Sequence, residues 1–92
     1  MALKNINYMM NLVNDFLNDR ISRLDMELDF NYELTERFPK MKREHREYAE
    51  VIFDYLSVDG VDAGDSLSDA EFKKLIRRQF KEVKDIVKSG FG

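Results

Sequence analysis

The sequence predicts an all-α protein, folded as an antiparallel four-helix bundle in a single domain that spans residues 1–92. Apolar residues recur at helical spacing in several separate stretches of the chain. One Pro and four Gly are too few for a fold of many short strands, and 43% hydrophobic residues are enough for one core. Short connections between the expected helices favour antiparallel neighbours.

The first helix is expected over about residues 4–18. Its apolar residues follow the i, i+3, i+4, i+7 spacing of one helix face. They are Ile6, Met9, Met10, Val13, Phe16 and Leu17.

The second segment allows two interpretations. Residues 26–34 alternate between apolar and polar side chains, which is typical of a strand, but the polar members are Glu, Asp and Asn, which strands disfavour. Ser22 is a suitable N-cap for a helix, and such a helix carries one apolar stripe of Ile21, Leu24, Leu28 and Tyr32 and another of Met26, Phe30 and Leu34. We favour the helix. A helix with two stripes lies centrally in a bundle or meets a partner, so a homodimer with Met26 and Phe30 as contacts is left open.

The third and fourth helices have clearer signals. The third is expected to begin after Pro39 and to run over about residues 40–56. Ser68 and Glu71 fit a capping box that starts the fourth, and Gly90 suits its end. The apolar face of the fourth helix consists of Phe72, Leu75, Ile76, Phe80, Val83 and Val87.

Charge is distributed unevenly, although the net charge is only −3. Residues 51–71 contain six acidic residues and no Lys or Arg, whereas residues 72–92 contain seven basic and two acidic residues. The sequence therefore predicts an acidic turn followed directly by a basic helix.

Few residues suit catalysis or metal binding. The chain has no Cys, no Gly-rich phosphate loop and no HExxH pair, and its one His, His45, falls on the apolar face of the third helix. Residues 59–72 resemble an EF-hand loop superficially, but with Leu67 and Glu71 in register, positions 1 and 5 are Gly60 and Gly64. We expect no enzyme, no catalytic residue, no cofactor and no metal, and keep a degenerate calcium site as a minor alternative.

The acidic stretch suits a protein partner. Carboxylates without nearby cations attract a strongly basic surface and give fast, salt-sensitive association. Phe53 and Tyr55 could add aromatic anchors. The competing interpretation is a small nucleic-acid-binding or regulatory module that uses Lys74, Arg78 and Lys81 of the fourth helix. The acidic balance of the whole domain argues against nucleic acid.

No stretch is apolar and long enough for a membrane span or a signal sequence, so the expected setting is the cytoplasm, without membrane contact.

Two stretches resemble a known family. Residues 16–22, FLNDRIS, lead into the acidic residues 24–27, LDME. Later, residues 49–56, AEVIFDYL, run into the acid-rich residues 58–62, VDGVD. In both respects the chain is similar to the colicin D/klebicin D-type immunity proteins, small helical bundles of the bacterial cytoplasm that neutralise a cognate nuclease toxin. In that family the acid-rich turn is commonly longer and often contains Pro, whereas residues 58–67 here contain none.

The resemblance implies a function. An immunity protein of this type covers the active site of a basic nuclease toxin domain of the tRNase type and presents carboxylates where nucleic-acid phosphates would lie. The expected toxin-binding residues of this chain are Asp54, Tyr55, Asp59, Asp62 and Asp65.

Overall fold

The computed structural model describes residues 2–91, which form four helical rods and contain no strand. α1 spans Lys4–Leu17 and α2 spans Arg23–Glu44. α3, Arg46–Ile52, continues without a break into a π-helical segment, η1, Phe53–Asp62. α4 spans Asp69–Lys88. The all-α, four-helix prediction is confirmed.

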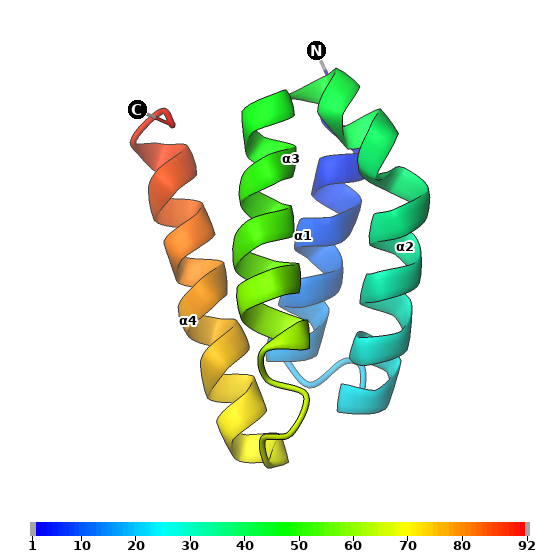
Figure 1. Ribbon diagram of the computed structural model, residues 1–92, viewed down its shortest axis with the longest axis vertical. Coiled ribbons are helices and arrows are strands. Elements are labelled where there is room, and N and C mark those ends of the chain that lie inside the picture. The colour runs from blue at the N-terminus through cyan, green and yellow to red at the C-terminus, as the bar shows by residue number, and fades with distance from the viewer. Residues whose placement is uncertain (1, 92) are drawn as a thin grey trace.

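Consecutive rods point in opposite directions in Figure 1. The chain runs down α1, up α2, down α3 and η1, and up α4, and α1 lies behind the space between α2 and α3. α2 and α4 stand on opposite sides of the molecule. The core is one apolar cluster that all the helices share. Its fully buried large side chains are Phe30, Phe72, Ile6, Met9, Met26, Met41, Ile52, Leu56, Ile76, Val13 and Val83.

The predicted helix starts at Ser22 and Ser68 are confirmed. The Ser22 hydroxyl oxygen accepts a hydrogen bond from the Asp25 N–H at 3.1 Å, and that of Ser68 accepts one from the Glu71 N–H at 3.3 Å. Both serines therefore satisfy an amide that lacks a partner within its own helix. Residues 26–34 are helical, so the strand alternative is wrong.

The predicted start of the third helix after Pro39 is also wrong. α2 continues through Pro39 to Glu44, and the chain breaks only at His45, whose φ of −164° is extended. Pro39 removes one backbone donor, and α2 changes direction in its C-terminal part (Figure 1). His45 is not on the apolar face of a helix but caps α3, because its Nδ1 accepts the Tyr48 N–H at 3.2 Å.

Glu44 ties the end of α2 to the start of α1. Its carboxylate accepts hydrogen bonds from the Asn5 N–H at 2.9 Å, the Ile6 N–H at 3.0 Å and the Asn5 side-chain amide at 2.7 Å. Partial burial alone would raise the pKa of Glu44, but these bonds and the charge of Arg37 outweigh it and lower the pKa. α1 is thus capped by another helix, since Leu3 at its own N-cap provides no side-chain acceptor.

Two glycines let the end of η1 approach α4 closely. A Cβ on Gly60 would lie 3.3 Å from Ile76 Cδ1, and one on Gly64 would lie 2.8 Å from Phe72 Cδ1 and 3.0 Å from Leu75 Cδ2. The absence of a side chain at these positions sets the distance between the acidic segment and the basic helix.

Candidate protein-binding groove

The five predicted site residues occupy one continuous segment. Asp54, Tyr55, Asp59 and Asp62 belong to η1, and only Asp65 lies in the connection to α4. The predicted acidic turn is therefore mostly helix. All four carboxylates are exposed, whereas Tyr55 is half-buried against the core, where its backbone carbonyl accepts a hydrogen bond from Gln79 Nε2 at 3.2 Å.

The carboxylates of η1 divide between two faces. In a π-helix, whose hydrogen bonds join residues five apart, residues separated by four or five positions share a face. Phe53, Ser57 and Asp62 share the face toward α2 and line one hollow with it. Asp54 and Asp59, also five residues apart, lie on the neighbouring outer face of η1. Only part of the predicted acidic cluster therefore faces another element.

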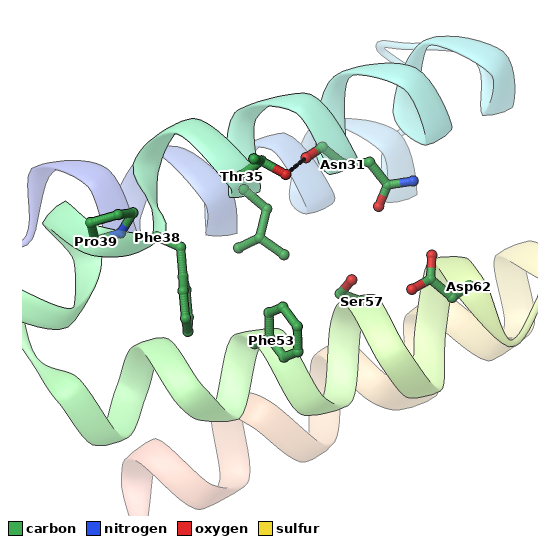
Figure 2. A pocket seen from close by; sticks show the side chains of 8 residues that line it. Asn31, Thr35, Phe38, Pro39, Phe53, Ser57 and Asp62 are labelled. Atoms are coloured by element: carbon green, nitrogen blue, oxygen red, sulfur yellow. Dashed lines mark hydrogen bonds between the residues drawn. The ribbon is translucent and has the colours of Figure 1, made fainter.

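Figure 2 shows the hollow between α2 and η1, which has a volume of about 520 Å³. Phe38 of α2 and Phe53 of η1 point into the space, and their ring centroids lie 5.2 Å apart. Asn31, Ser57 and Asp62 stand at the opposite end in the same view. Its lining is thus apolar at one end and polar, with one carboxylate, at the other.

Two further hollows continue this one along α2. The second shares Asn31 and Asp62 with the first, and the third shares Glu27 and Asp65 with the second. Together they form what we call the α2–η1 groove. It is lined by Ser22, Arg23, Leu24, Glu27, Leu28, Asn31, Leu34, Thr35, Phe38 and Pro39 on the α2 side, and by Phe53, Ser57, Val61, Asp62, Asp65, Leu67 and Asp69 on the other.

An exposed apolar stripe accompanies the groove. Leu24, Leu28 and Tyr32 of α2 are 65%, 62% and 64% exposed. Three large apolar side chains in a row at helical spacing are more than the scattered exposure of an ordinary surface. Of the two stripes that the sequence shows on α2, this one faces outward and the other forms the core.

The homodimer contacts that the sequence left open are therefore wrong. Met26 and Phe30 are fully buried in the core of the protein and cannot contact a second copy. Both belong to the core cluster that all the helices share. The apolar stripe that α2 leaves exposed is that of Leu24, Leu28 and Tyr32.

Arg23 closes one end of the groove, a role that the sequence does not reveal. Its guanidinium donates hydrogen bonds to the carbonyls of Leu67 at 2.6 Å and of Gly64 and Asp65 at 3.2 Å each. The same group pairs with the Asp69 carboxylate at 3.0 Å. The acidic segment contains no Lys or Arg of its own, but in the folded protein Arg23 of α2 binds to it.

The loop that an EF-hand requires is not formed, because residues 59–62 belong to η1. Within residues 2–91, no three His, Asp or Glu side chains lie together in a way that could hold a metal ion.

The basic residues of α4 lie on a separate face. A hollow of about 400 Å³ between α1 and α4 is lined partly by Arg77, Lys81 and Lys84. Phe80 is buried as the sequence predicts, and the Lys84 ammonium covers its ring at 4.8 Å from the centroid. Farther along, Lys73 pairs with Asp19, and a hydrogen bond and the charge from Lys73 lower the pKa of that carboxyl.

No family model matches the chain, and no curated protein and no solved structure is significantly similar to it. Among residues 2–91, no helix has both the length and the apolar character that crossing a membrane demands.

Proposed function

We propose that this protein binds and inhibits a basic protein partner through the α2–η1 groove. One observation carries the proposal: the carboxylates of Asp62 and Asp65 line the same groove that the exposed stripe of α2 accompanies. An apolar surface beside charges of one sign is the arrangement that specific protein interfaces use.

The two parts of the surface contribute differently. Complete burial of a leucine side chain contributes about 1.5–3 kcal/mol, so Leu24 and Leu28 offer affinity to a partner that covers them. The carboxylates speed the encounter and select a partner of opposite charge. A partner with a basic surface and apolar residues within it satisfies both requirements.

A nuclease toxin domain is the partner class that we favour. Such a domain needs cations to hold nucleic-acid phosphates, and the resemblance to immunity proteins of the colicin D/klebicin D type implies the same partner. Asp62 and Asp65 would then take the place of phosphates, with Asp54 and Asp59 on the adjoining outer face. Inhibition would be steric and electrostatic, without catalysis by this chain, and would take place in the cytoplasm.

The test is capture from native lysate at low and high salt, followed by a nuclease assay on the captured material. We expect a basic protein whose nucleic-acid cleavage is suppressed by one equivalent of the wild-type chain. The double variant Asp62→Lys/Asp65→Lys should lose capture and suppression, while Lys74→Glu/Arg78→Glu on α4 should retain both. Capture and suppression that survive the groove variant would refute the proposal.

The basic face of α4 supports a second candidate, a nucleic-acid-binding module. The observation behind it is the α1–α4 hollow, where Arg77, Lys81 and Lys84 converge. Phosphate binding needs only such a group of cations. However, Phe80 in this hollow is only 7% exposed and the Lys84 ammonium covers its ring, which leaves little of it for base stacking. Recovery of RNA or DNA without a protein, abolished by Arg77→Glu/Lys81→Glu, would favour this candidate.

A further inference from the structure

The α2–η1 groove is long enough to hold an element of secondary structure. It follows α2 from Phe38 at one end to Leu24 at the other. Fourteen residues of helix correspond to about 21 Å, or roughly four helical turns. A single side chain would occupy only a fraction of this length.

The polarity of the groove changes along its length. Phe38, Pro39 and Phe53 form the apolar end, in the hollow of Figure 2. Asn31 and Asp62 mark the middle, where the first two hollows meet. The far end has the carboxylates of Glu27, Asp65 and Asp69 and one cation, Arg23, which pairs with Glu27 at 3.3 Å and with Asp69 at 3.0 Å. This end stays net acidic, because the carboxylates of Asp65 and of the adjoining Asp62 do not pair with Arg23. An occupant must therefore be apolar at one end and cationic toward the other.

We infer that the groove receives an amphipathic helix of the partner, an inference that rests on the proposed function. This helix carries an apolar or aromatic anchor for the Phe38–Phe53 end and Lys or Arg residues on the same face for the acidic end. Asn31 and Glu27 lie seven and eleven residues from Phe38 along α2. The cations of the partner helix therefore follow its anchor by about two to three turns.

A helix suits this site better than a strand. Residues 2–91 contain no strand, so they offer no sheet edge to which an extended segment could add. Both walls of the apolar end of the groove are helical, and helix-in-groove recognition uses apolar anchors at i, i+3, i+4 and i+7. A helix also satisfies its own backbone donors and acceptors when an apolar wall covers it.

Two synthetic 18-residue peptides of identical Leu, Phe, Lys and Ala composition test the inference. One places Phe, Leu and Lys on a single helix face, with Phe toward one end and Lys two to three turns away, and the other has the same residues scrambled. We expect the ordered peptide to bind the full chain at least tenfold more tightly and to gain helicity on binding. Its NMR shift changes should fall within residues 24–38 and 53–65. Equal affinities, or no binding of the ordered peptide at about 1 mM, would overturn the inference.

A matched pair of variants locates the anchor. Thr35 is exposed on α2 and lines the apolar hollow. Thr35→Trp should therefore obstruct the hollow and weaken binding of the ordered peptide at least fivefold, while Thr35→Ala should leave binding unchanged. Asn31→Trp, one turn away, serves if Thr35→Trp fails to fold. If the captured partner tolerates the folded obstructed variant but not Asp62→Lys/Asp65→Lys, the helix inference is wrong and the proposed function stands. If it tolerates both of these variants, the inference and the proposed function both fail.

Discussion

At the N-terminus of α1, the first backbone N–H groups have no partner within their own helix, and Glu44 accepts two of them. Because the pKa of Glu44 is lowered from its ordinary value of 4.5 in the folded protein, the carboxylate stabilises the fold at neutral pH. That contribution is fully present above about pH 4.5 and is lost as the pH falls through the lower folded value.

Glu44→Gln should therefore destabilise the protein at pH 7 by about 1 kcal/mol, the usual contribution of a helix cap. The free energies of unfolding of wild type and variant, measured in urea from pH 7 to pH 3, should converge toward the acid end. A difference that stays constant over this range would mean that the charge of Glu44 is not involved.

Arg23 combines several interactions at one position. Besides its bonds to three carbonyls, its guanidinium lies 4.4 Å from the centroid of the Phe72 ring. Arg23→Ala should lower the free energy of unfolding by about 1–2 kcal/mol, because three carbonyls, one of them partly buried, then lose a charged donor. Arg23→Lys should recover only part of this loss, since an ammonium lacks the planar fork.

Arg20→Ala is the matched control for Arg23. The Arg20 side chain is exposed and makes one ion pair, with Asp15 at 3.0 Å, so its loss should cost under about 0.5 kcal/mol. Urea unfolding measures both variants, and hydrogen exchange of residues 64–69 should accelerate only in the Arg23 variants. Equal effects at the two arginines would contradict the role given to Arg23.

At the scale of elements, the contact between α4 and the end of η1 with its following connection depends on Gly64. Gly64→Ala would bring a methyl group within 2.8 Å of the Phe72 ring and 3.0 Å of Leu75, so the two elements would have to separate. We expect the free energy of unfolding, measured in urea, to fall by about 1–3 kcal/mol. Ser66→Ala, at an exposed position of the same connection, should change stability little. A Gly64 variant as stable as wild type would show that η1 is free to shift.

The helices could be predicted where the sequence carries a local signal. Ser22 and Ser68 predict the starts of α2 and α4, and the apolar stripes of α1 and α4 predict which faces of these helices are buried. The boundary between α2 and α3 could not be predicted. A proline inside a helical pattern usually ends the helix, whereas α2 continues through Pro39 and only bends there. The helix boundary lies at His45, which caps α3. No local sequence pattern predicts that the chain leaves the helical conformation at this residue.

The candidate site was predictable only in part, for a reason that concerns the whole molecule. The acidic residues Asp62 and Asp65 are visible in sequence, but the opposite wall of their groove comes from α2, more than twenty residues earlier. The two stripes of α2 are nearly equivalent as patterns. Only the burial of Met26 and Phe30 in the shared core decides that Leu24 and Leu28 face outward.

The molecule as a whole has its acidic groove and the basic helix α4 on different sides, with α2 and α4 opposite one another in Figure 1. α4 starts at the acidic end of the groove, where Asp69 lines it, and its distance from the groove grows by about 1.5 Å per residue. The cations in the C-terminal half of α4, such as Lys84, therefore lie more than two Debye lengths of about 8 Å from Asp69 and are largely screened from a ligand in the groove at physiological salt. Local contacts should decide the affinity there, rather than the net charge of the chain.

Two double variants separate these effects, because Asp62→Lys/Asp65→Lys and Lys74→Glu/Arg78→Glu change the net charge of −3 by four units in opposite directions. For the ordered basic peptide, the groove variant should weaken binding more than tenfold, with a lower association rate and a faster dissociation rate.

The α4 variant should raise the association rate by no more than about threefold at 50 mM salt, and should leave it unchanged at 300 mM. Its dissociation rate should stay unchanged, because α4 does not line the groove beyond its first residue. Stopped-flow kinetics at both salt concentrations gives these rates, and equal and opposite changes in affinity would show that net charge alone governs binding.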